Sequence, residues 1–447
     1  MTSPSGPIRE ISAAERELEL DAYAADQAVI AGVEQLRFFP LAITHGSGST
    51  LTTASGRECI DLSASWTATG LGLGNPRITQ AIQDAATAAP ASSVLSAATA
   101  RSTKLATLLT ELTPVRGKKP KAYLGLAGTD ANDVAIRAAR HHTGRSRILT
   151  FDQSYHGGLG IAQLSSGIAI DGDGNEVATV LPYPSTPEEL DGLRAQLDTA
   201  LGAGDVAAVI VEALQCDGGV RTPPSGFLTL LREVCDRANA LLIVDEVKAG
   251  LARTGTLFAF QHEQITPDIV TLGKSLGGGL SVSAAVAGDG ILDAPSASAL
   301  LTTAGADIAA AAATAVLDEV TSVALRENVT QRAEQLDRTL REYKAGDRPG
   351  ARLVHELRGR GLLRGIALSG SADASGSDAN IGAKVAYRAW ELGAVAYVVG
   401  DNVIELTPAL TIAEAELANG IDRLLAAIDD VAGGAVHDDD IAAYGGW

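Results

Sequence analysis

Between about residues 78 and 286 the chain alternates stretches of helical periodicity with short apolar runs. Short runs rich in Val, Ile and Leu are typical of strands that are buried on both faces. Strands that alternate with helices predict a mostly parallel sheet covered by helices, which is an α/β fold. The predicted strands lie at 122–126, 148–151, 206–214, 241–244 and 284–286. Ligands of such sheets bind beyond the carboxyl ends of the strands.

The two ends of the chain predict a second, smaller α/β domain. A short β segment is expected at 51–62, and an amphipathic helix from about residue 321 to 344. Further strands are expected at 363–368, 395–399 and 403–406. The expected domains are an N-terminal segment of the small domain at 1–70, a large domain at 71–320 and the C-terminal part of the small domain at 321–447.

Composition narrows the classes of function. The 447 residues are 46% hydrophobic and 20% charged, which is typical of a well-buried globular chain. A formal charge of -19 without a Lys/Arg stripe argues against nucleic acid or an anionic membrane as a partner. Cys59, Cys216 and Cys235 are widely spaced, and the acidic run at 171–176 lacks two key positions of a calcium loop, so we predict neither disulfides nor a metal site. Because no signal sequence or membrane span is recognised, we expect a cytoplasmic protein that acts on a small molecule.

Lys274 and Asp245 are the first candidates for chemistry, because Asp245 ends the apolar run 241–244 and Lys274 follows a second such run. A lysine amine can hold pyridoxal phosphate as a Schiff base, and a carboxylate can keep the pyridine nitrogen protonated so that the ring accepts carbanion electrons. The tripeptide 273–275 also imitates the end of a phosphate-binding P-loop, but Asp268 stands where that loop needs a glycine. The pair therefore predicts carbanion chemistry beside an amino group.

Other candidate residues follow the neighbouring predicted strands. Gly128 and Thr129 open a helix that runs to about residue 141, where free backbone N–H groups can bind phosphate. Tyr155 comes just after the next strand, where its ring can stack on a flat cofactor, and His156 is expected to support that loop. Taken singly, these are a helix cap and a buried tyrosine, so their order along the chain carries the prediction.

That order resembles the class III aminotransferase family, whose members are fold type I pyridoxal phosphate enzymes. The resemblance extends from about residue 36 to residue 447. It implies a mostly parallel, seven-stranded type of sheet in the large domain and a smaller α/β domain formed by both termini. The matching residues are Gly128-Thr129, Tyr155-His156-Gly157, Asp217, Asp245-Glu246-Val247, Arg253-Thr254-Gly255 and Lys274.

The resemblance also implies a role for each matching residue. Lys274 would bind the cofactor covalently, Asp245 would pair with its pyridine nitrogen, and Tyr155 would stack on its ring. Val247 would pack against the opposite face of the ring. Thr302 would reach the phosphate from a partner subunit, which implies a homodimer with shared active sites.

Within the family, several segments are most similar to the α-amino-ε-caprolactam racemase group. Trp66 and Tyr397 are the candidates for the substrate pocket, although either could be an aromatic of the core or of a dimer interface. The similar segments are 36–41, 60–63 with Trp66, 245–248 with 250–253, and Gly446-Trp447.

Glu405 stands where ordinary members of the family tend to carry an arginine that clamps the substrate carboxylate. A carboxylate at this place would repel a substrate carboxylate and accept a neutral carbonyl, as in an amino amide or a lactam. The alternative is that Glu405 faces solvent and the clamp comes from elsewhere.

Asp217 suggests racemisation, which needs proton removal from one face of Cα and delivery to the other face. Lys274 and Asp217 are the predicted pair of bases, and Asp217 could deliver a proton if burial raised its pKa. The alternative is that Asp217 caps the loop after its strand. The sequence therefore predicts a racemase or epimerase that acts on a small amino lactam, amino amide or related amino compound.

Two other functions stay open. One is an aminotransferase that passes an amino group to a keto acid or aldehyde. The other is a catalytically silent pyridoxal phosphate-binding homologue, because the chain departs from the family pattern near the phosphate and substrate positions. The departures are Ala304-Gly305-Ala306-Asp307 after Thr302, Ala213 after Glu212, and Ala409 after Pro408.

Overall fold

The computed structural model describes residues 8–88, 90–168, 177–369, 380–400 and 402–444. The predicted turn at 171–176 and the Gly446-Trp447 segment lie outside these residues. The chain divides into two compact units, one formed by Met1–Asn75 with Glu327–Trp447 and the other by Pro76–Arg326. The prediction from the sequence had placed the two boundaries at residues 70 and 320.

The larger unit is built on a seven-stranded sheet among its described residues, in the order β4-β10-β9-β8-β7-β5-β6. Strand β10 runs antiparallel to both of its neighbours, and the other neighbouring pairs are parallel. This confirms the predicted mostly parallel α/β sheet. The strands are β4 (Lys121–Gly125), β5 (Arg147–Phe151), β6 (Ala178–Leu181), β7 (Val206–Glu212), β8 (Leu241–Asp245), β9 (Ile269–Leu272) and β10 (Ser283–Ala287).

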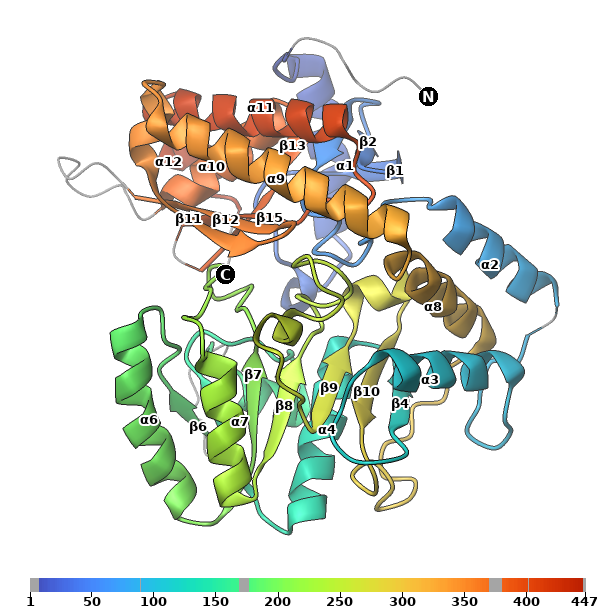
Figure 1. Cartoon of the computed structure of the whole chain (residues 1–447). Helices are drawn as coiled ribbons and strands as arrows, with labels where there is room; N and C mark the ends of the chain where they lie inside the picture. The colour runs from blue at the N-terminus through green and yellow to red at the C-terminus, as the bar shows by residue number, and fades with distance from the viewer. Residues whose placement is uncertain (1–7, 89, 169–176, 370–379, 401, 445–447) are drawn as a thin grey trace. The chain divides into compact units, whose positions relative to one another are not determined.

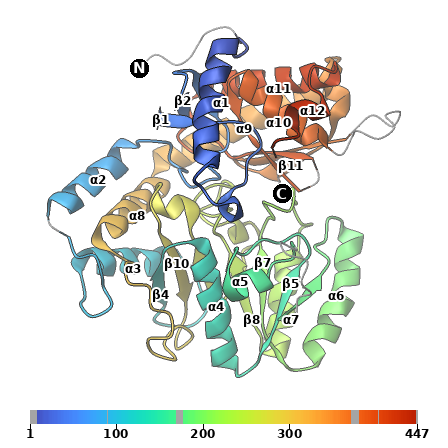
Figure 2. The same ribbon diagram turned by 180° about the vertical axis from the view of Figure 1, so that it is seen from behind.

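Helices cover both faces of this sheet. Every residue of β7 is buried, as expected for a central strand that is covered on both sides. Figures 1 and 2, which differ by a half turn, show α7 in front of the sheet in one view and α4 and α5 in front in the other. The helices are α2 (Pro76–Thr87), α3 (Ala100–Leu112), α4 (Gly128–Thr143), α5 (Gly160–Leu164), α6 (Pro187–Gly202), α7 (Phe227–Ala238) and α8 (Asp307–Val320).

The smaller unit contains two four-stranded sheets among the described residues, with the orders β1-β2-β3-β13 and β11-β12-β15-β14. The parallel pairing of β3 with β13 joins the N-terminal and C-terminal segments of the chain. The predicted strand at 395–399 is in fact two strands, which pair in different sheets. The strands are β1 (Ile43–Ser47), β2 (Thr50–Thr53), β3 (Glu58–Asp61), β11 (Val354–Arg360), β12 (Leu363–Leu368), β13 (Ala394–Val395), β14 (Tyr397–Val399) and β15 (Val403–Leu406).

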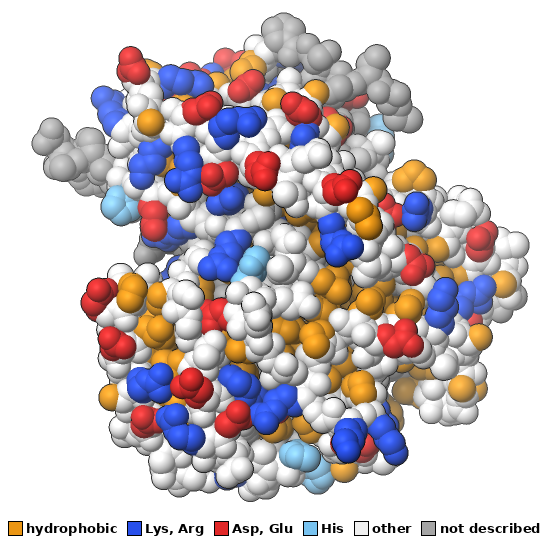
Figure 3. Space-filling view, in the orientation of Figure 1, with side chains coloured by type: hydrophobic (Ala, Val, Ile, Leu, Met, Phe, Trp, Pro, Cys, Tyr) orange, Lys and Arg blue, Asp and Glu red, His pale blue; other side chains and the backbone are white. Residues whose placement is uncertain are grey.

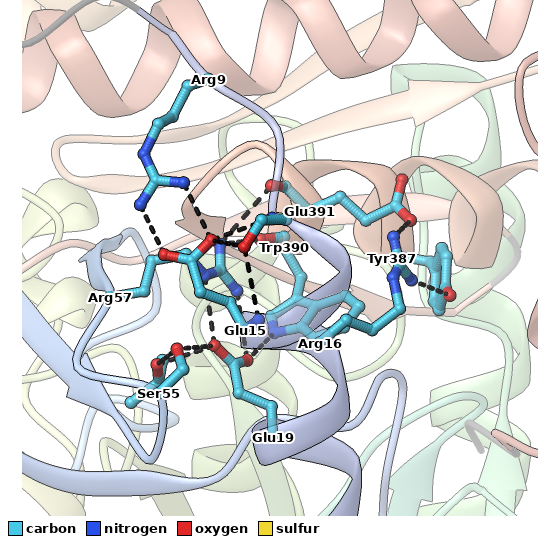
Figure 4. A network of polar contacts seen from close by, with 11 residues as sticks. Arg9, Glu15, Arg16, Glu19, Ser55, Arg57, Tyr387, Trp390 and Glu391 are labelled. Carbon is cyan, nitrogen blue, oxygen red and sulfur yellow. Dashed lines mark hydrogen bonds and ion pairs between the residues drawn. The ribbon is translucent and has the colours of Figure 1, made fainter.

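Helix α1 (Ala13–Gln27) is fixed to the smaller unit by a buried glutamate (Figure 4). The Glu19 side chain is fully buried and accepts hydrogen bonds from Thr53 and Ser55, from the guanidinium of Arg57 and from the indole of Trp390. Trp390 belongs to α10, so this carboxylate connects both ends of the chain. The remaining helices are α9 (Val323–Ala345), α10 (Ile381–Glu391), α11 (Glu414–Ala432) and α12 (Asp438–Ile441).

No single helix within the described ranges is long and apolar enough to span a membrane. Helices α8 and α9 reach that length and composition when they are taken together, across a bend of 66°.

Candidate active site

The carboxyl ends of the parallel strands in the larger unit surround a cavity of about 230 Å³. Thr302, in contrast, is exposed on the turn before α8 and lies outside the cavity lining. Its predicted role in a partner subunit stays a prediction. The predicted residues that line the cavity are Gly128, Thr129, Tyr155, His156, Asp217, Asp245, Val247 and Lys274. Asn132, Glu212 and Lys248 also line it, and no role was predicted for them from the sequence.

The N-terminus of α4 forms one side of the cavity. Asp130 caps it by accepting hydrogen bonds from the backbone N–H groups of Leu126 and Ala127, at 2.8 and 3.1 Å. A Cβ atom on Gly128 would lie 2.5 Å from a methyl group of Val247, so a glycine is required for this close approach. A helix N-terminus presents backbone N–H groups that can bind a phosphate, and this one lies in the cavity lining close to Val247.

Asp245 ends β8 and is held by donors from three elements. Its Oδ2 atom accepts from Asn132 Nδ2 at 2.7 Å and lies 2.8 Å from His156 Nδ1, and its Oδ1 accepts from the backbone N–H of Val247. Thr271 of β9 donates to the amide oxygen of Asn132 at 2.6 Å, which fixes the orientation of that amide. The Asp245 carboxylate is thus buried, oriented and available to a cationic partner in the cavity.

The sequence predicted only that His156 supports the loop of Tyr155. In the structure its ring also contacts Asp245 directly. The side chain is fully buried. Its Nε2 atom has no hydrogen-bond partner among the described residues. A buried polar atom normally has a partner, so this atom marks space in which a further group can bind.

Burial and charge shift the pKa values of two further carboxyl groups in opposite directions. Glu212 ends β7 and accepts hydrogen bonds from the backbone N–H groups of Tyr155 and Cys216. Burial, and then the charges of Asp245 and Asp217, raise the pKa of Glu212 well above its usual value. Glu212 therefore holds its proton more tightly than an exposed glutamate does.

Asp217 is ionised, because Lys248 Nζ donates to its Oδ1 at 2.6 Å. Burial acts to raise the pKa of Asp217, but the charges of Lys248 and Lys274 and the hydrogen bond from Lys248 outweigh burial and lower it. The condition under which the sequence let Asp217 deliver a proton, a pKa raised by burial, is therefore not met. Sequence reasoning also missed Glu212 and Lys248, although Glu212, like Asp245, is an acidic residue at the end of a fully apolar run.

Trp66, Tyr397 and Glu405 belong to the smaller unit. The rings of Trp66 and Tyr397 stack on each other, with centroids 4.7 Å apart and an angle of 7°. Glu405 lies opposite Tyr397 in the β14–β15 pair and is only 1% exposed, so the alternative that it faces solvent is wrong. The assignment of these three residues to a substrate pocket stays a prediction.

Comparison with known proteins identifies the family. A model of aminotransferase class-III matches residues 31–428. The chain belongs to the class III aminotransferase family. A leucine/methionine racemase from Thermococcus litoralis is 30% identical over 432 residues, which cover 92% of this chain and 96% of that protein. An acetylornithine aminotransferase from Xanthomonas axonopodis pv. citri is 35% identical over 393 residues, or 86% of this chain and 91% of that protein.

Solved structures of the family confirm the fold. An ornithine aminotransferase from Toxoplasma gondii aligns with a TM-score of 0.81 at 25% identity, over 93% of this chain and 95% of that one. An N-acetylornithine aminotransferase from Stenotrophomonas maltophilia aligns with a TM-score of 0.72 at 30% identity, over 92% of this chain and 99% of that one. The class III family member described here is therefore a fold type I enzyme, and its cofactor is pyridoxal phosphate.

The cavity fits this cofactor by the chemistry of its residues. The α4 N-terminus beside Gly128 can hold a phosphate, and the Asp245 carboxylate can hold a protonated ring nitrogen. Lys274 supplies an amine to the same space, and the unpartnered Nε2 of His156 leaves a polar atom for a bound group. Cofactor binding was thus predicted from the sequence and is confirmed at the level of the family.

Proposed function

We propose that this enzyme is a racemase or epimerase that inverts the α-carbon of a small amino compound, such as an amino amide or amino lactam. The observation that carries this proposal is that an ionised carboxylate, Asp217, and a lysine amine, Lys274, line one cavity. Two groups that can exchange protons with the same carbon are what inversion requires. The T. litoralis leucine/methionine racemase, which matches over nearly its whole length, supports the same class of reaction.

In this proposal each residue of the cavity has a separate role in the reaction. The cofactor, when bound, supplies a conjugated ring that accepts electrons from the substrate Cα. Asp245, held by Asn132 and His156, keeps the ring nitrogen protonated. Asp217 and Lys274 then take the Cα proton from one face and return a proton to the other.

The experiment follows Cα deuterium and chirality together, in deuterated buffer and without a keto acid. Each enantiomer of α-amino-ε-caprolactam, leucinamide, leucine and methionine is incubated with the holoenzyme. Deuterium incorporation with loss of optical purity is expected for at least one of them. Retention of the Cα hydrogen and of chirality in all of them would contradict the proposal.

Asp217→Asn separates the two-base mechanism from cofactor binding. The amide cannot accept the proton, so racemisation should fall by about 10²- to 10⁴-fold, the usual contribution of a general base. Cofactor affinity, measured by titrating the apoenzyme, should change much less. An Asp217→Asn enzyme with wild-type racemisation would refute the two-base mechanism.

Amino transfer is the second candidate, because acetylornithine and 4-aminobutyrate aminotransferases are among the relatives. Transfer reprotonates the cofactor instead of Cα, so it needs a keto acid or an aldehyde as acceptor. A panel of keto acids with the same amino compounds tests it. An enzyme that binds the cofactor and performs neither reaction would be the silent homologue.

We further propose that the enzyme is a homodimer. Figure 3 shows hydrophobic side chains gathered over the part of the larger unit that contains α3 and α8. Leu95 and Leu300 are 45% and 59% exposed, and an apolar hollow of about 460 Å³ lies between α3, β4 and the segment 299–304. Exposed apolar area of this kind favours association. Thr302 lies within the same segment, so a second copy that covers it would receive this residue.

A further inference from the structure

Lys248 is a buried lysine for which the cofactor motifs provide no role. It follows Val247 in the turn after β8, and its side chain is only 4% exposed. Lysine is seldom buried, because removing its charge from water is costly unless a counter-charge compensates. Here the counter-charge is Asp217, whose side chain is 6% exposed and whose Oδ1 lies 2.6 Å from Lys248 Nζ. Both residues line the cavity that also contains Lys274.

Several ionisable groups face Asp217 from different elements. Lys248 acts on it from the turn after β8, by charge and by a hydrogen bond, and Lys274 acts by charge from the turn after β9. Burial, and then the charges of Asp245 and Asp217, raise the pKa of Glu212 at the end of β7. Tyr155 also faces Asp217, and burial followed by that negative charge raises the pKa of its hydroxyl. Two lysines, a glutamate and a tyrosine thus interact electrostatically with this one carboxylate.

We propose that Lys248 is a positioning residue that holds Asp217 as an ionised, oriented proton acceptor beside Lys274. This inference rests on the proposed racemase function and assigns to Lys248 the control of one of its two bases. The ion pair holds the Asp217 carboxylate beside Lys248. The turn after β8 sets the position of that lysine. The ion pair also favours the charged form over the neutral form, because only the charged form attracts Lys248 fully.

The proton balance of the proposed step shows why such control is needed. When Asp217 acts as the base, the Cα–H bond breaks and an O–H bond forms on Asp217, while the electron pair remains with the carbon, where a bound cofactor would stabilise it. Lys274 gives a proton to the other face of Cα. In the opposite direction Asp217 returns its proton. A neutral Asp217 beside Lys248 is a stronger acid than an ordinary carboxyl group, so it does not retain the proton between turnovers.

The test compares pH profiles of kcat/KM for racemisation in wild type, Lys248→Met and Lys248→Arg. The reaction needs ionised Asp217 in the free enzyme, so its rate falls as pH decreases through the pKa of that carboxyl. Loss of the neighbouring positive charge should move this acidic limb to higher pH by about 1 to 3 units, the usual effect of one close opposite charge. Lys248→Arg keeps the charge and should restore the wild-type limb.

The matched control is Lys384→Met, which removes a largely buried lysine that pairs with Asp438 in the smaller unit. It should leave the acidic limb in place. Lys248→Gln repeats the comparison with a polar, uncharged side chain in case the methionine variant does not fold. An acidic limb that stays at the wild-type pH in the folded, uncharged variants would overturn the inference, and so would an arginine variant that behaves like them.

A second measurement needs no turnover and separates this inference from the proposed function. Infrared difference titration of the holoenzyme without substrate follows the carboxylic acid C=O band of Asp217, assigned by its loss in Asp217→Asn. The band should appear at higher pH in Lys248→Met than in wild type. If wild type racemises none of the tested compounds, the proposed function fails, and this titration still decides whether Lys248 sets the ionisation of Asp217. An unshifted band would contradict the inference even in an active racemase.

Discussion

Lys274 occupies a strained backbone position. It follows β9 with a positive φ of 43°, a region that costs a residue with a Cβ on the order of 1–2 kcal/mol. The preceding Gly273 packs so closely that a Cβ there would lie 3.1 Å from the backbone nitrogen of Gly128. The turn after β9 is thus held against the start of α4. This packing keeps Lys274 in its strained backbone conformation and directs its side chain to the cavity. Strain of this kind is often found at functional residues.

Replacing Lys274 by alanine should remove the covalent bond to the cofactor. We expect the absorbance of the lysine-bound cofactor to disappear and activity to fall by at least about 10²- to 10⁴-fold, since a nucleophile and a base are both lost. Borohydride reduction followed by peptide mass spectrometry should place the cofactor on Lys274 in the wild type. Lys104→Ala, at an exposed position of α3, is the control. An unchanged spectrum in Lys274→Ala would refute the assignment.

Glu246, next to Asp245 in the chain, makes the stability of the folded protein depend on pH. It is 1% exposed and accepts backbone hydrogen bonds from Ala259 and Phe260 at 2.8 and 2.9 Å. Burial, which these hydrogen bonds oppose in part, raises the pKa of Glu246 to about 8. The folded protein therefore binds a proton here that the unfolded chain releases near pH 4.5. The resulting stabilisation is full below that pH and is lost as pH rises through about 8.

Glu246→Gln should therefore flatten the pH dependence of stability. In wild type we expect the free energy of unfolding to decrease by on the order of a few kcal/mol between pH 5 and pH 8, measured by urea denaturation. The glutamine variant cannot ionise, so its slope should be smaller, with a remainder from Glu212, whose pKa is also raised. Glu233→Gln, at a half-exposed site, should keep the wild-type slope. Equal slopes in wild type and Glu246→Gln would rule out this effect.

At the scale of elements, the first turn of α4 is the most sensitive part of the cofactor site. A methyl group on Gly128 would overlap Val247 at 2.5 Å, so Gly128→Ala must displace either the helix N-terminus or Val247. We expect the dissociation constant for pyridoxal phosphate to increase by about tenfold or more, which corresponds to roughly 1.4 kcal/mol. Fluorescence or absorbance titration of the apoenzyme measures this change.

The matched control is Gly192→Ala in the middle of α6, where an added methyl group meets nothing within 4 Å. This change should raise stability by about 0.5–1 kcal/mol through helix propensity and leave cofactor affinity unaltered. If both variants bind the cofactor like wild type, the close contact between α4 and Val247 does not limit binding.

Strands β4, β5, β7, β8 and β10 of the larger sheet were predictable because buried strands are continuously apolar, as in β7 and β8. Strands β6 and β9 were not predicted, and β6 is only partly buried. Strand β11 was missed because its sequence, Val354–Arg360, carries charged residues on a half-exposed strand. The β13–β14 division was missed because the apolar run 394–399 continues through it. A pattern of hydrophobicity shows where a strand can form, but the sheet in which each half pairs depends on tertiary contacts.

The candidate site was predictable in its cofactor residues, which follow strands in a recognisable order. Its hydrogen bonds were not, because they join residues far apart in sequence. Asn132 and Asp245 are 113 positions apart, and Lys248 and Asp217 are 31 apart. Burial of Lys248 and Glu212 could not be deduced either, since charged residues are usually exposed. The lowered pKa of Asp217 could not be foreseen for the same reason, because it depends on its partner Lys248.

At the scale of the whole molecule, the residues of the predicted site belong to two units. The cavity residues all lie within Pro76–Arg326, whereas Trp66, Tyr397 and Glu405, which the sequence predicts to meet the substrate, belong to the other unit. The order of the cavity residues along the chain made the family clear from the sequence, while the reaction of this chain requires assays.

If the enzyme is a homodimer with shared active sites, each site contains residues of both subunits. Hybrid dimers test this prediction. One subunit carries Lys274→Ala and the other Thr302→Glu, whose negative charge should repel a phosphate. Each parent dimer should be inactive or nearly so. If Thr302 acts on the partner's site, a hybrid has one complete site, with Lys274 from one subunit and Thr302 from the other. Hybrids purified through two different affinity tags should then show about half of the wild-type activity per dimer.

If Thr302 acts within its own subunit, the same hybrid contains no complete site and stays inactive. Sedimentation measurements first establish whether the wild type is a dimer at the assay concentration, because a monomer would contradict the proposal at once. A fully active Thr302→Glu parent would show that the residue does not contact the phosphate, in line with the altered segment 304–307 that follows it. Restored activity in the hybrid has no explanation within one subunit, so it would establish that two chains build each site.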